Sequence, residues 1–285
     1  MTTNINDVRK ALSSDFDNLA GCLLPMGYAH TVPWSNEEDY LNNLYFATQW
    51  SKQLSSKLVL STPKSNYSLR IDCEKVHKRI LVEFPFKRKL QSCEIGDILI
   101  VSKYVDPHGI LSRNVCFIQV KVSDKKKRFD VWKIDEKQLY FYSKWPIINN
   151  CYTGRGSNRH ILLKNLKISH RNRLFSSYLL LGRSRHPGLS YGPYPWITGT
   201  DLVATASNRN GKMQGPLEVA FLYHLIQLIF QVNGERDISK YKSNNSNLTQ
   251  LVNRLLKYVN LNDPPEGEGR PFVAITLTLK IPEAQ

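Results

Sequence analysis

An acid and an amine on two segments typical of neighbouring β-strands are the residues best suited to chemistry. Asp97 begins one Ile- and Val-rich segment and Lys121 lies in another, with the turn signal Asp106-Pro107-His108-Gly109 between them. If the two segments pair as antiparallel strands about residue 109, Asp97 faces Lys121 across the hairpin. Gln119 lies two residues before Lys121, so we expect it on the same face.

This set of side chains fits the hydrolysis of phosphodiester bonds, which needs an activated water and neutralisation of charge on the phosphate. Asp97 would be the anionic ligand of Mg²⁺ or Mn²⁺, and hard cations of this kind favour oxygen ligands. The Gln119 side-chain carbonyl and the Val120 backbone carbonyl could add two more oxygens. Lys121 would orient the water and stabilise the developing charge. Glu94 is either a second carboxylate ligand or a solvated residue at the entry to the strand.

A second motif follows on a segment that we expect to be helical, from about residue 135 to 143. Gln138 and Tyr142 are four residues apart, so both side chains belong to one helical face. The segment ends at Trp145-Pro146, and proline cannot continue a helix. The motif would therefore present its glutamine and tyrosine together, directly after the hairpin in the chain.

The order of these motifs resembles the PD-(D/E)xK superfamily, the fold of restriction endonucleases and many DNA-repair exonucleases. The resemblance covers roughly residues 79–145. Gln119-Val120-Lys121 stands where the family has an acidic-x-Lys triplet, in a variant similar to that of Mrr-type enzymes. Gln138 and Tyr142 are similar to the Gln-xxx-Tyr motif of RecB-type exonuclease domains, which lines the site and contacts DNA.

The resemblance implies a restriction endonuclease-like core, a mixed central sheet flanked by helices, within an α+β chain. It also implies a Mg²⁺-dependent deoxyribonuclease, for which roles in restriction or antiphage defence are common. The glutamine at position 119 removes one negative charge from the metal site and should weaken metal binding. It leaves open a catalytically inactive nucleic-acid-binding or regulatory subunit, and a plain surface ion pair between Asp97 and Lys121 is the simplest alternative.

The charge of the chain favours an anionic partner. There are 39 Lys and Arg against 24 Asp and Glu, a formal charge of +15, and residues 137–200 contain no acid. Such a stretch favours DNA binding, although a generally basic surface without a dedicated groove would look the same. The candidate DNA-contacting residues are Lys125, Lys126, Lys127, Arg128, Arg155, Arg159, Arg183 and Arg185.

The Gly- and Pro-rich segment 182–196 is expected to be a long loop, because it can form neither a helix nor an interior strand. Its two arginines, Arg183 and Arg185, and its aromatic residues suit a lid over nucleic acid. The same residue types are enriched at protein interfaces. The loop could therefore serve a homo-oligomer or a partner protein of a defence system instead.

The remaining patterns predict an α+β architecture, with a nuclease core in residues 1–150 and a basic extension in 151–285 that completes it, or one single domain. Ser35 and Glu38 form a capping box that opens a helix to about residue 57. The resemblance implies that a glutamate of this helix can join the site, and Glu38 is the candidate, although capping explains it better. Further strands are expected at 69–73, 79–84, 161–163, 178–181 and 272–281, the last half-buried, and further helices at 215–232 and 247–259.

Cysteine usage and hydropathy indicate a cytoplasmic protein that does not enter a membrane. The five cysteines form no C-x-x-C pair, which argues against a disulfide framework or a zinc site. The first residues lack the basic and apolar regions of a secretory signal. The most apolar run, 217–232, contains polar residues and is expected to be a buried helix.

Overall fold

The computed structural model describes residues 36–39, 41–42, 45, 59–61, 66–106, 109–123, 135–154, 156–168, 176–182, 247–261 and 271–280. Residues 37–39, 41–42 and 45 are helical. The other elements, in chain order, are β1 (Val59–Ser61), β2 (Asn66–Val76), β3 (Ile80–Phe86), β4 (Lys89–Glu94), β5 (Ile98–Asp106), β6 (Gly109–Ser123), α4 (Glu136–Lys144), β7 (Ile148–Thr153), the 3₁₀ turn η1 (Gly156–Asn158), β8 (His160–Leu166), β9 (Ser176–Gly182), α7 (Asn247–Leu261) and β10 (Phe272–Lys280).

The larger sheet has six strands in the order β1-β2-β10-β5-β6-β9. It is mixed, because β10 runs parallel to β5 and β9 runs parallel to β6, whereas the other pairs are antiparallel. β5 lies inside this sheet, and all four residues from Ile98 to Val101 are fully buried. Residues that point to either face of the sheet are buried at the start of β5, and this explains why the run there is apolar without alternation.

β10 corrects one expectation and shows how the end of the chain completes the core. Alternating residues predicted a half-buried strand, and Thr276 and Thr278 are partly exposed as expected, whereas Phe272 to Ile275 are all buried. Phe272 and Ala274 belong to the shared core, and β10 pairs with β2 and β5 in the middle of the sheet. Three strands from beyond residue 150 therefore take part in the two sheets. β10 and β9 belong to the larger sheet, with β9 at its edge, and β8 belongs to the smaller one.

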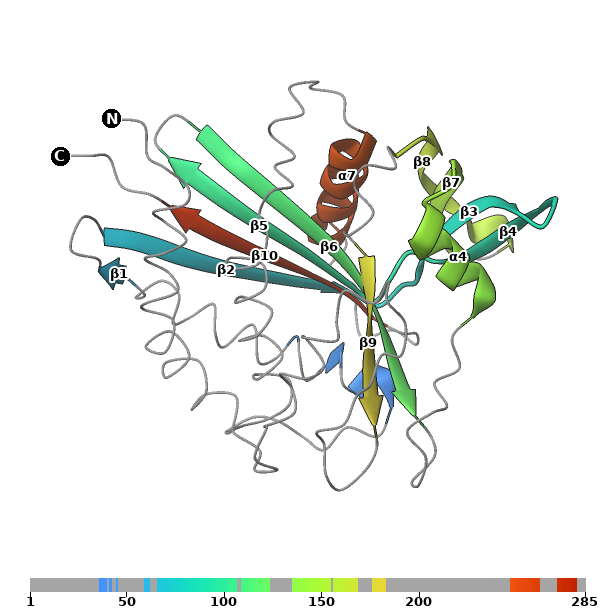
Figure 1. Ribbon diagram of the computed structural model, residues 1–285, viewed down its shortest axis with the longest axis horizontal. Coiled ribbons are helices and arrows are strands. Elements are labelled where there is room, and N and C mark those ends of the chain that lie inside the picture. The colour runs from blue at the N-terminus through green and yellow to red at the C-terminus, as the bar shows by residue number, and fades with distance from the viewer. Residues whose placement is uncertain are drawn as a thin grey trace.

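The smaller sheet is antiparallel throughout, in the order β4-β3-β7-β8. Figure 1 shows it with α4 on one side of the molecule, where the β3–β4 hairpin projects outward, while the six-stranded sheet extends to the other side. The chain crosses between the sheets at residues 77–79 and again at residues 95–97. The second crossing separates Glu94, the last residue of β4, from β5, which begins at Ile98.

α4 joins the two sheets through a row of aromatic rings. The ring of Phe141 lies 5.2 Å from that of Phe84 in β3 and 4.6 Å from that of Trp145. The Trp145 ring in turn lies 5.5 Å from that of Phe117 in β6. Ring contacts at these separations add to the stabilisation from burial. The helix that carries Gln138 and Tyr142 is thereby packed against both sheets.

Both ends of α4 agree with the sequence prediction. Asp135 is the N-cap, and its side chain accepts a hydrogen bond from the Lys137 N–H at 2.8 Å. Trp145 ends the helix in the left-handed conformation, with φ +43°, and its N–H donates to the Phe141 carbonyl at 2.7 Å. A capping aspartate at one end and Pro146 beyond the other restrict the helix to this stretch.

α7 packs its apolar face into the shared core. Leu248, Leu251, Val252 and Leu255 are buried there, in agreement with the predicted helix at 247–259. The strands expected at 69–73, 79–84, 161–163 and 178–181 correspond to β2, β3, β8 and β9. The predicted helix at 215–232 lies outside the described residues. Within the described part of the chain, no helix has the length and apolar character needed to cross a membrane.

Candidate active site

Asp97 is fixed by backbone bonds to two strands at the crossing from β4 to β5. Its N–H donates to the Ile118 carbonyl of β6 at 2.8 Å, and its carbonyl accepts from the Val273 N–H of β10 at 2.9 Å. Its side chain is almost fully buried, with 3% of the residue exposed. A carboxylate held from both sides in this way keeps a defined position inside the protein.

The glycine before it is required by a close approach of the chain to its neighbours. Gly96 has φ +151°, and a Cβ there would lie 2.8 Å from the Tyr142 hydroxyl oxygen and 3.2 Å from the Ile118 carbonyl oxygen. A side chain would therefore push apart α4 and β6, the two elements that surround the crossing. Glycine is the residue that allows this approach.

The pairing of β5 with β6 corrects the predicted partner of Asp97. Ile98 pairs with Ile118, so Asp97 lies level with Gln119, and Lys121 is two residues farther along β6. The hairpin closes where Asp106 pairs with Gly109, with a register shift between Tyr104 and Val105. The fold axis thus falls before residue 109, and Asp97 meets the glutamine instead of the lysine.

The Asp97 carboxylate holds its proton more strongly than an ordinary aspartate. Burial is the main cause and the negative charge of Glu94 is the second, and together they raise the pKa of Asp97 to about 8. Glu37 acts in the same direction, whereas Lys121 and the Val120 N–H lower this pKa. That N–H donates to Asp97 Oδ2 at 2.7 Å. Burial thus disfavours the charged form of Asp97, and the nearby Glu94 and Glu37 add to that effect more than Lys121 and the Val120 N–H offset.

A chain of three side chains, here called the glutamine relay, leads from α4 to Asp97. Gln138 Nε2 donates to the backbone carbonyl of Glu94 at 3.1 Å and also to Gln119 Oε1. Gln119 Nε2 in turn donates to Asp97 Oδ2. All three side chains are buried. β4 is an edge strand of its sheet, so Gln138 supplies the partner that a further strand would otherwise provide.

The relay determines which way the Gln119 amide faces. A carbonyl oxygen can only accept, so Gln138 must present its nitrogen to Glu94. That same nitrogen meets Gln119, which must then present its oxygen to Gln138 and its nitrogen to Asp97. The expected metal-ligating oxygen of Gln119 is thus turned towards α4. It could ligate a cation only after the amide rotates and gives up its bond to Gln138.

Tyr142 holds the crossing from the other side, one helical turn after Gln138. Its hydroxyl donates to the Ile95 carbonyl at 3.0 Å, and its side chain is buried. The two side chains share one face of α4, as the spacing predicted. From that face, Gln138 and Tyr142 contact consecutive residues of the chain, Glu94 and Ile95. Both act on the backbone that positions Asp97.

Two charged contacts complete the surroundings of Asp97. Glu94 forms an ion pair with Arg79, which is in the other crossing between the sheets, with 3.0 Å between Oε1 and Nε. Lys121 Nζ lies 3.9 Å from Glu37 Oε1, and both side chains are largely buried. Glu94, Asp97 and Gln119 therefore lie together, Lys121 is close enough to lower the Asp97 pKa from two residues farther along β6, and Arg79 is an addition.

The carboxylate from the N-terminal helix is Glu37, not Glu38, the residue considered from the sequence. Asn36 is the residue that caps this helix, because its side-chain oxygen accepts from the Asp39 N–H at 2.9 Å. The helix therefore begins one residue later than a cap at Ser35 implies, and a one-residue shift turns a different side chain inward. The sequence contains no signal that distinguishes these two adjacent glutamates.

Among the predicted DNA-contacting residues, the structure describes only Arg159. Its guanidinium pairs with Glu83 at 2.9 Å and lies 3.7 Å from the centre of the Tyr152 ring. These contacts raise its pKa, through the hydrogen bond to Glu83 first. Arg159 therefore has a partner within the protein already. The other predicted contacts lie outside the described residues, namely Lys125, Lys126, Lys127, Arg128, Arg155, Arg183 and Arg185, and so does the loop expected after β9.

Several oxygen atoms surround the nitrogen of Gln119. Asp97 Oδ2 accepts from it, and Glu94 Oε2 and the Val120 carbonyl oxygen each lie 3.5 Å away. Two carboxylates and one backbone carbonyl thus converge on a single group that donates hydrogen bonds. Within the described ranges, no group of three or more His, Cys, Asp or Glu side chains is arranged to hold a metal ion. Any cation at this point would also need the carbonyl and amide oxygens.

Comparisons with protein-family models, with curated proteins and with solved structures found no match.

Proposed function

We propose that this protein is a metal-dependent nuclease that hydrolyses DNA phosphodiester bonds at the crossing from β4 to β5. The observation that carries the proposal is a buried carboxylate, Asp97, in the field of Glu94 and Glu37, with Lys121 on the same side of the hairpin. Two carboxylates that converge on one point beside a lysine suit a divalent cation and a phosphate. The motifs that resemble the PD-(D/E)xK superfamily supply Asp97, Gln119 and Lys121, while Glu37 and Arg79 come from other parts of the chain.

The residues present fit Mg²⁺ or Mn²⁺ through their oxygen atoms. Asp97, Glu94 and the Val120 carbonyl already converge on one nitrogen, and hard cations favour such ligands. A cation there would favour the charged form of Asp97, which burial first and Glu94 second disfavour. It would supply an activated water and neutralise charge on the phosphate. Gln119 joins the ligands only if its amide turns away from Gln138.

The protein's own groups orient the reaction. Lys121 would place its ammonium against the phosphate and offset the charge that builds up during cleavage. Glu37, 3.9 Å from Lys121, keeps that ammonium near the end of the hairpin. Gln138 and Tyr142 hold the backbone on which Asp97 is placed. The formal charge of +15 favours a nucleic acid as the substrate. Restriction or antiphage defence in the cytoplasm is the setting in which such an activity would serve.

Plasmid cleavage is the direct test. Wild-type protein is incubated with supercoiled plasmid in the presence of Mg²⁺, Mn²⁺ or EDTA, and nicked and linear products are measured. We expect cleavage with the metals and none with EDTA. Lys121→Ala should cut at least about 100-fold more slowly, whereas the matched control Lys257→Ala, at an exposed position of α7, should cut normally. Equal cleavage by the Lys121 and Lys257 variants would contradict the proposed site.

The glutamine relay favours a second candidate, a catalytically inactive nucleic-acid-binding or regulatory subunit. In it, the amide of Gln119 takes the place of a cation by donating to Asp97, so that no metal is needed. Isothermal titration with Mn²⁺ distinguishes the two candidates. A nuclease binds Mn²⁺ in the wild type and loses it in Asp97→Asn, and Gln119→Glu binds it more tightly. An inactive subunit binds none in the wild type, and Gln119→Glu only weakens its affinity for DNA.

A further inference from the structure

The tip of the β3–β4 hairpin has a sequence that its backbone conformation does not favour. Phe86 pairs with Lys89, which leaves Lys87 and Arg88 as a two-residue loop. Both loop residues have left-handed backbone angles, with φ +48° and +63°. Loops of this kind strongly prefer Asn-Gly, Asp-Gly or Gly-Gly, since other residues are strained at positive φ. Two long cationic residues therefore occupy positions where turn stability alone would favour asparagine, aspartate or glycine.

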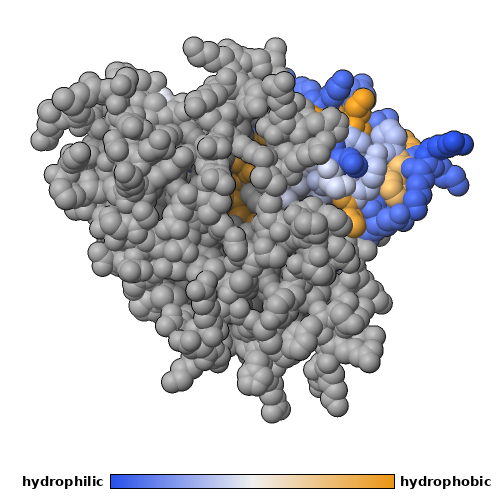
Figure 2. Space-filling model, viewed as in Figure 1, coloured by the Kyte–Doolittle hydropathy of each residue, from blue (hydrophilic) through white to orange (hydrophobic). Residues whose placement is uncertain are grey.

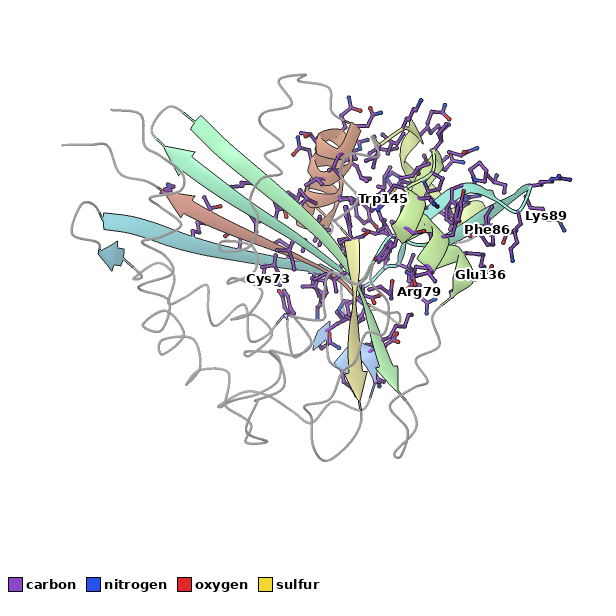
Figure 3. All side chains as sticks on the ribbon, viewed as in Figure 1. Cys73, Arg79, Phe86, Lys89, Glu136 and Trp145 are labelled. Atoms are coloured by element: carbon purple, nitrogen blue, oxygen red, sulfur yellow. The ribbon has the colours of Figure 1, made fainter. Side chains whose placement is uncertain are left out.

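The tip carries three cations in succession and places them far from the body of the protein. Lys87, Arg88 and Lys89 are all exposed, and Figure 3 shows Lys89 at the outermost end of the hairpin, beyond Phe86 and Glu136. Figure 2 shows the same projecting end as strongly hydrophilic. Among the described residues, only Glu136 forms an ion pair with the tip, at 2.8 Å from Lys87, and both of those side chains are about two-thirds exposed.

We propose that this tip, Lys87 to Lys89, is a contact for the phosphate backbone of duplex DNA, separate from the site at Asp97. Cations held at strained backbone positions of an exposed tip, where Glu136 is their one ion-pair partner among the described residues, are explained if a polyanion is their partner. Exposed ion pairs such as Lys87–Glu136 are weak, so Lys87 can exchange Glu136 for a phosphate. The choice of DNA as the polyanion rests on the proposed nuclease function. The charge and exposure of the tip are observed independently of that function.

The position of the tip predicts where on the duplex it would bind. β4 connects the tip to the site directly, from Lys89 to Glu94, and six residues of a strand span roughly 17 Å. At about 3.4 Å for each base pair, the tip would reach phosphates roughly five base pairs from the phosphate at Asp97. A duplex that extends only one or two base pairs beyond the cleaved bond would not reach it. The tip would therefore contribute to the binding of longer duplexes alone.

The decisive variant is Lys87→Asn with Arg88→Gly, because it removes two cations and installs the residues that the turn prefers. Affinity for duplexes of about 20 base pairs is measured by fluorescence anisotropy across a series of salt concentrations without divalent metal, and Tm is measured in parallel. We expect Tm to rise and the salt slope of log Kd to fall by about 1.8, or 0.9 for each contact. Affinity near 0.1 M salt should fall roughly 10- to 60-fold.

Three controls separate a DNA contact from a general loss of charge. Lys144→Gln with Lys257→Gln removes two exposed cations from α4 and α7 and should leave the slope unchanged. Arg88→Lys keeps the charge and should keep the slope. Glu136→Gln removes the carboxylate that competes for Lys87, so affinity should increase.

The outcomes distinguish this proposal from the proposed function. A falling salt slope with a rising Tm supports the tip, even if the wild-type protein cleaves no plasmid with Mg²⁺ or Mn²⁺, and in that case only the nuclease assignment fails. Plasmid cleavage by the wild type with an unchanged slope in the double variant overturns the tip alone. A lower Tm in the double variant, or the same loss from the Lys144 and Lys257 changes, also overturns it. Preferential loss of affinity for duplex RNA of equal length would transfer the contact to another nucleic acid and overturn the proposal for DNA.

Discussion

Replacing Gln138 with leucine tests the glutamine relay, which connects α4 to Asp97. Leucine has a similar size and favours helices, so α4 itself should tolerate the change. It cannot donate hydrogen bonds, however. The substitution therefore removes both donations made by Gln138, to the Glu94 carbonyl and to Gln119 Oε1, and leaves these two acceptors without their partner.

The magnitude follows from burial. Gln138 is 3% exposed and Gln119 is fully buried, so water cannot readily replace the lost donor. A buried polar group left without a partner costs about 1–3 kcal/mol, and there are two such groups. The apolar surface of the new leucine recovers roughly 1–2 kcal/mol of this cost. The midpoint of these terms predicts that Gln138→Leu lowers the free energy of unfolding by about 2.5 kcal/mol.

Urea unfolding followed by far-UV circular dichroism measures this free energy, with Gln250→Leu as the matched control. Gln250 is an exposed residue of another helix, α7. The same substitution there should change the free energy of unfolding by no more than about 0.5 kcal/mol. A double-mutant cycle with Gln119→Leu then isolates the bond between the two glutamines. We expect their effects to be non-additive by about 1 kcal/mol or more.

Two results would refute this reasoning. If Gln138→Leu is no more destabilising than Gln250→Leu, the relay does not hold the edge of β4. If Gln138→Leu and Gln119→Leu are strictly additive, the two amides do not interact, and the orientation assigned to Gln119 loses its basis.

Two further predictions concern Asp97 and Gly96. The folded protein retains a proton on Asp97 that the unfolded chain releases, because burial and Glu94 raise the pKa from 3.8 to about 8; metal-free protein should therefore lose stability as the pH rises through that interval, by at most about 1.4 kcal/mol per pH unit. Asp97→Asn should flatten this dependence and Glu94→Gln should move it to lower pH, as measured by Tm between those limits, and an unchanged profile in Asp97→Asn would assign the effect to another group. Gly96→Ala should destabilise the protein by about 2–4 kcal/mol, and by less in a Tyr142→Phe background, where the closest atom is gone; an equal cost in both backgrounds would show that the hydroxyl is not the obstacle.

The sequence by itself determined the parts of the site that depend on neighbours along the chain. The limits of α4 follow from Asp135 at its start and Pro146 beyond its end, and the spacing of Gln138 and Tyr142 places both on one face of that helix. The turn at residues 106–109 likewise identified the hairpin of β5 and β6. Capping, helical periodicity and turn preferences act over a few residues, so they can be read from a single sequence.

Only the tertiary structure decided which residue meets Asp97. A register shift between Tyr104 and Val105 and the closure of the hairpin at Gly109 place Gln119, and not Lys121, level with it. Alternative registers of two apolar strands differ little in local preference. The choice is made by packing against the rest of the sheet.

Long-range assembly likewise decided the remaining surroundings of the site. Glu37 and Arg79 reach it from parts of the chain whose local patterns carry no signal of that destination, and β10 enters between β2 and β5 from nearly two hundred residues away in the sequence. Contacts of this kind form because apolar faces must be buried somewhere, and which faces meet depends on the whole chain at once. The sequence could therefore propose the chemistry of this site, whereas the arrangement of its charges came from the fold.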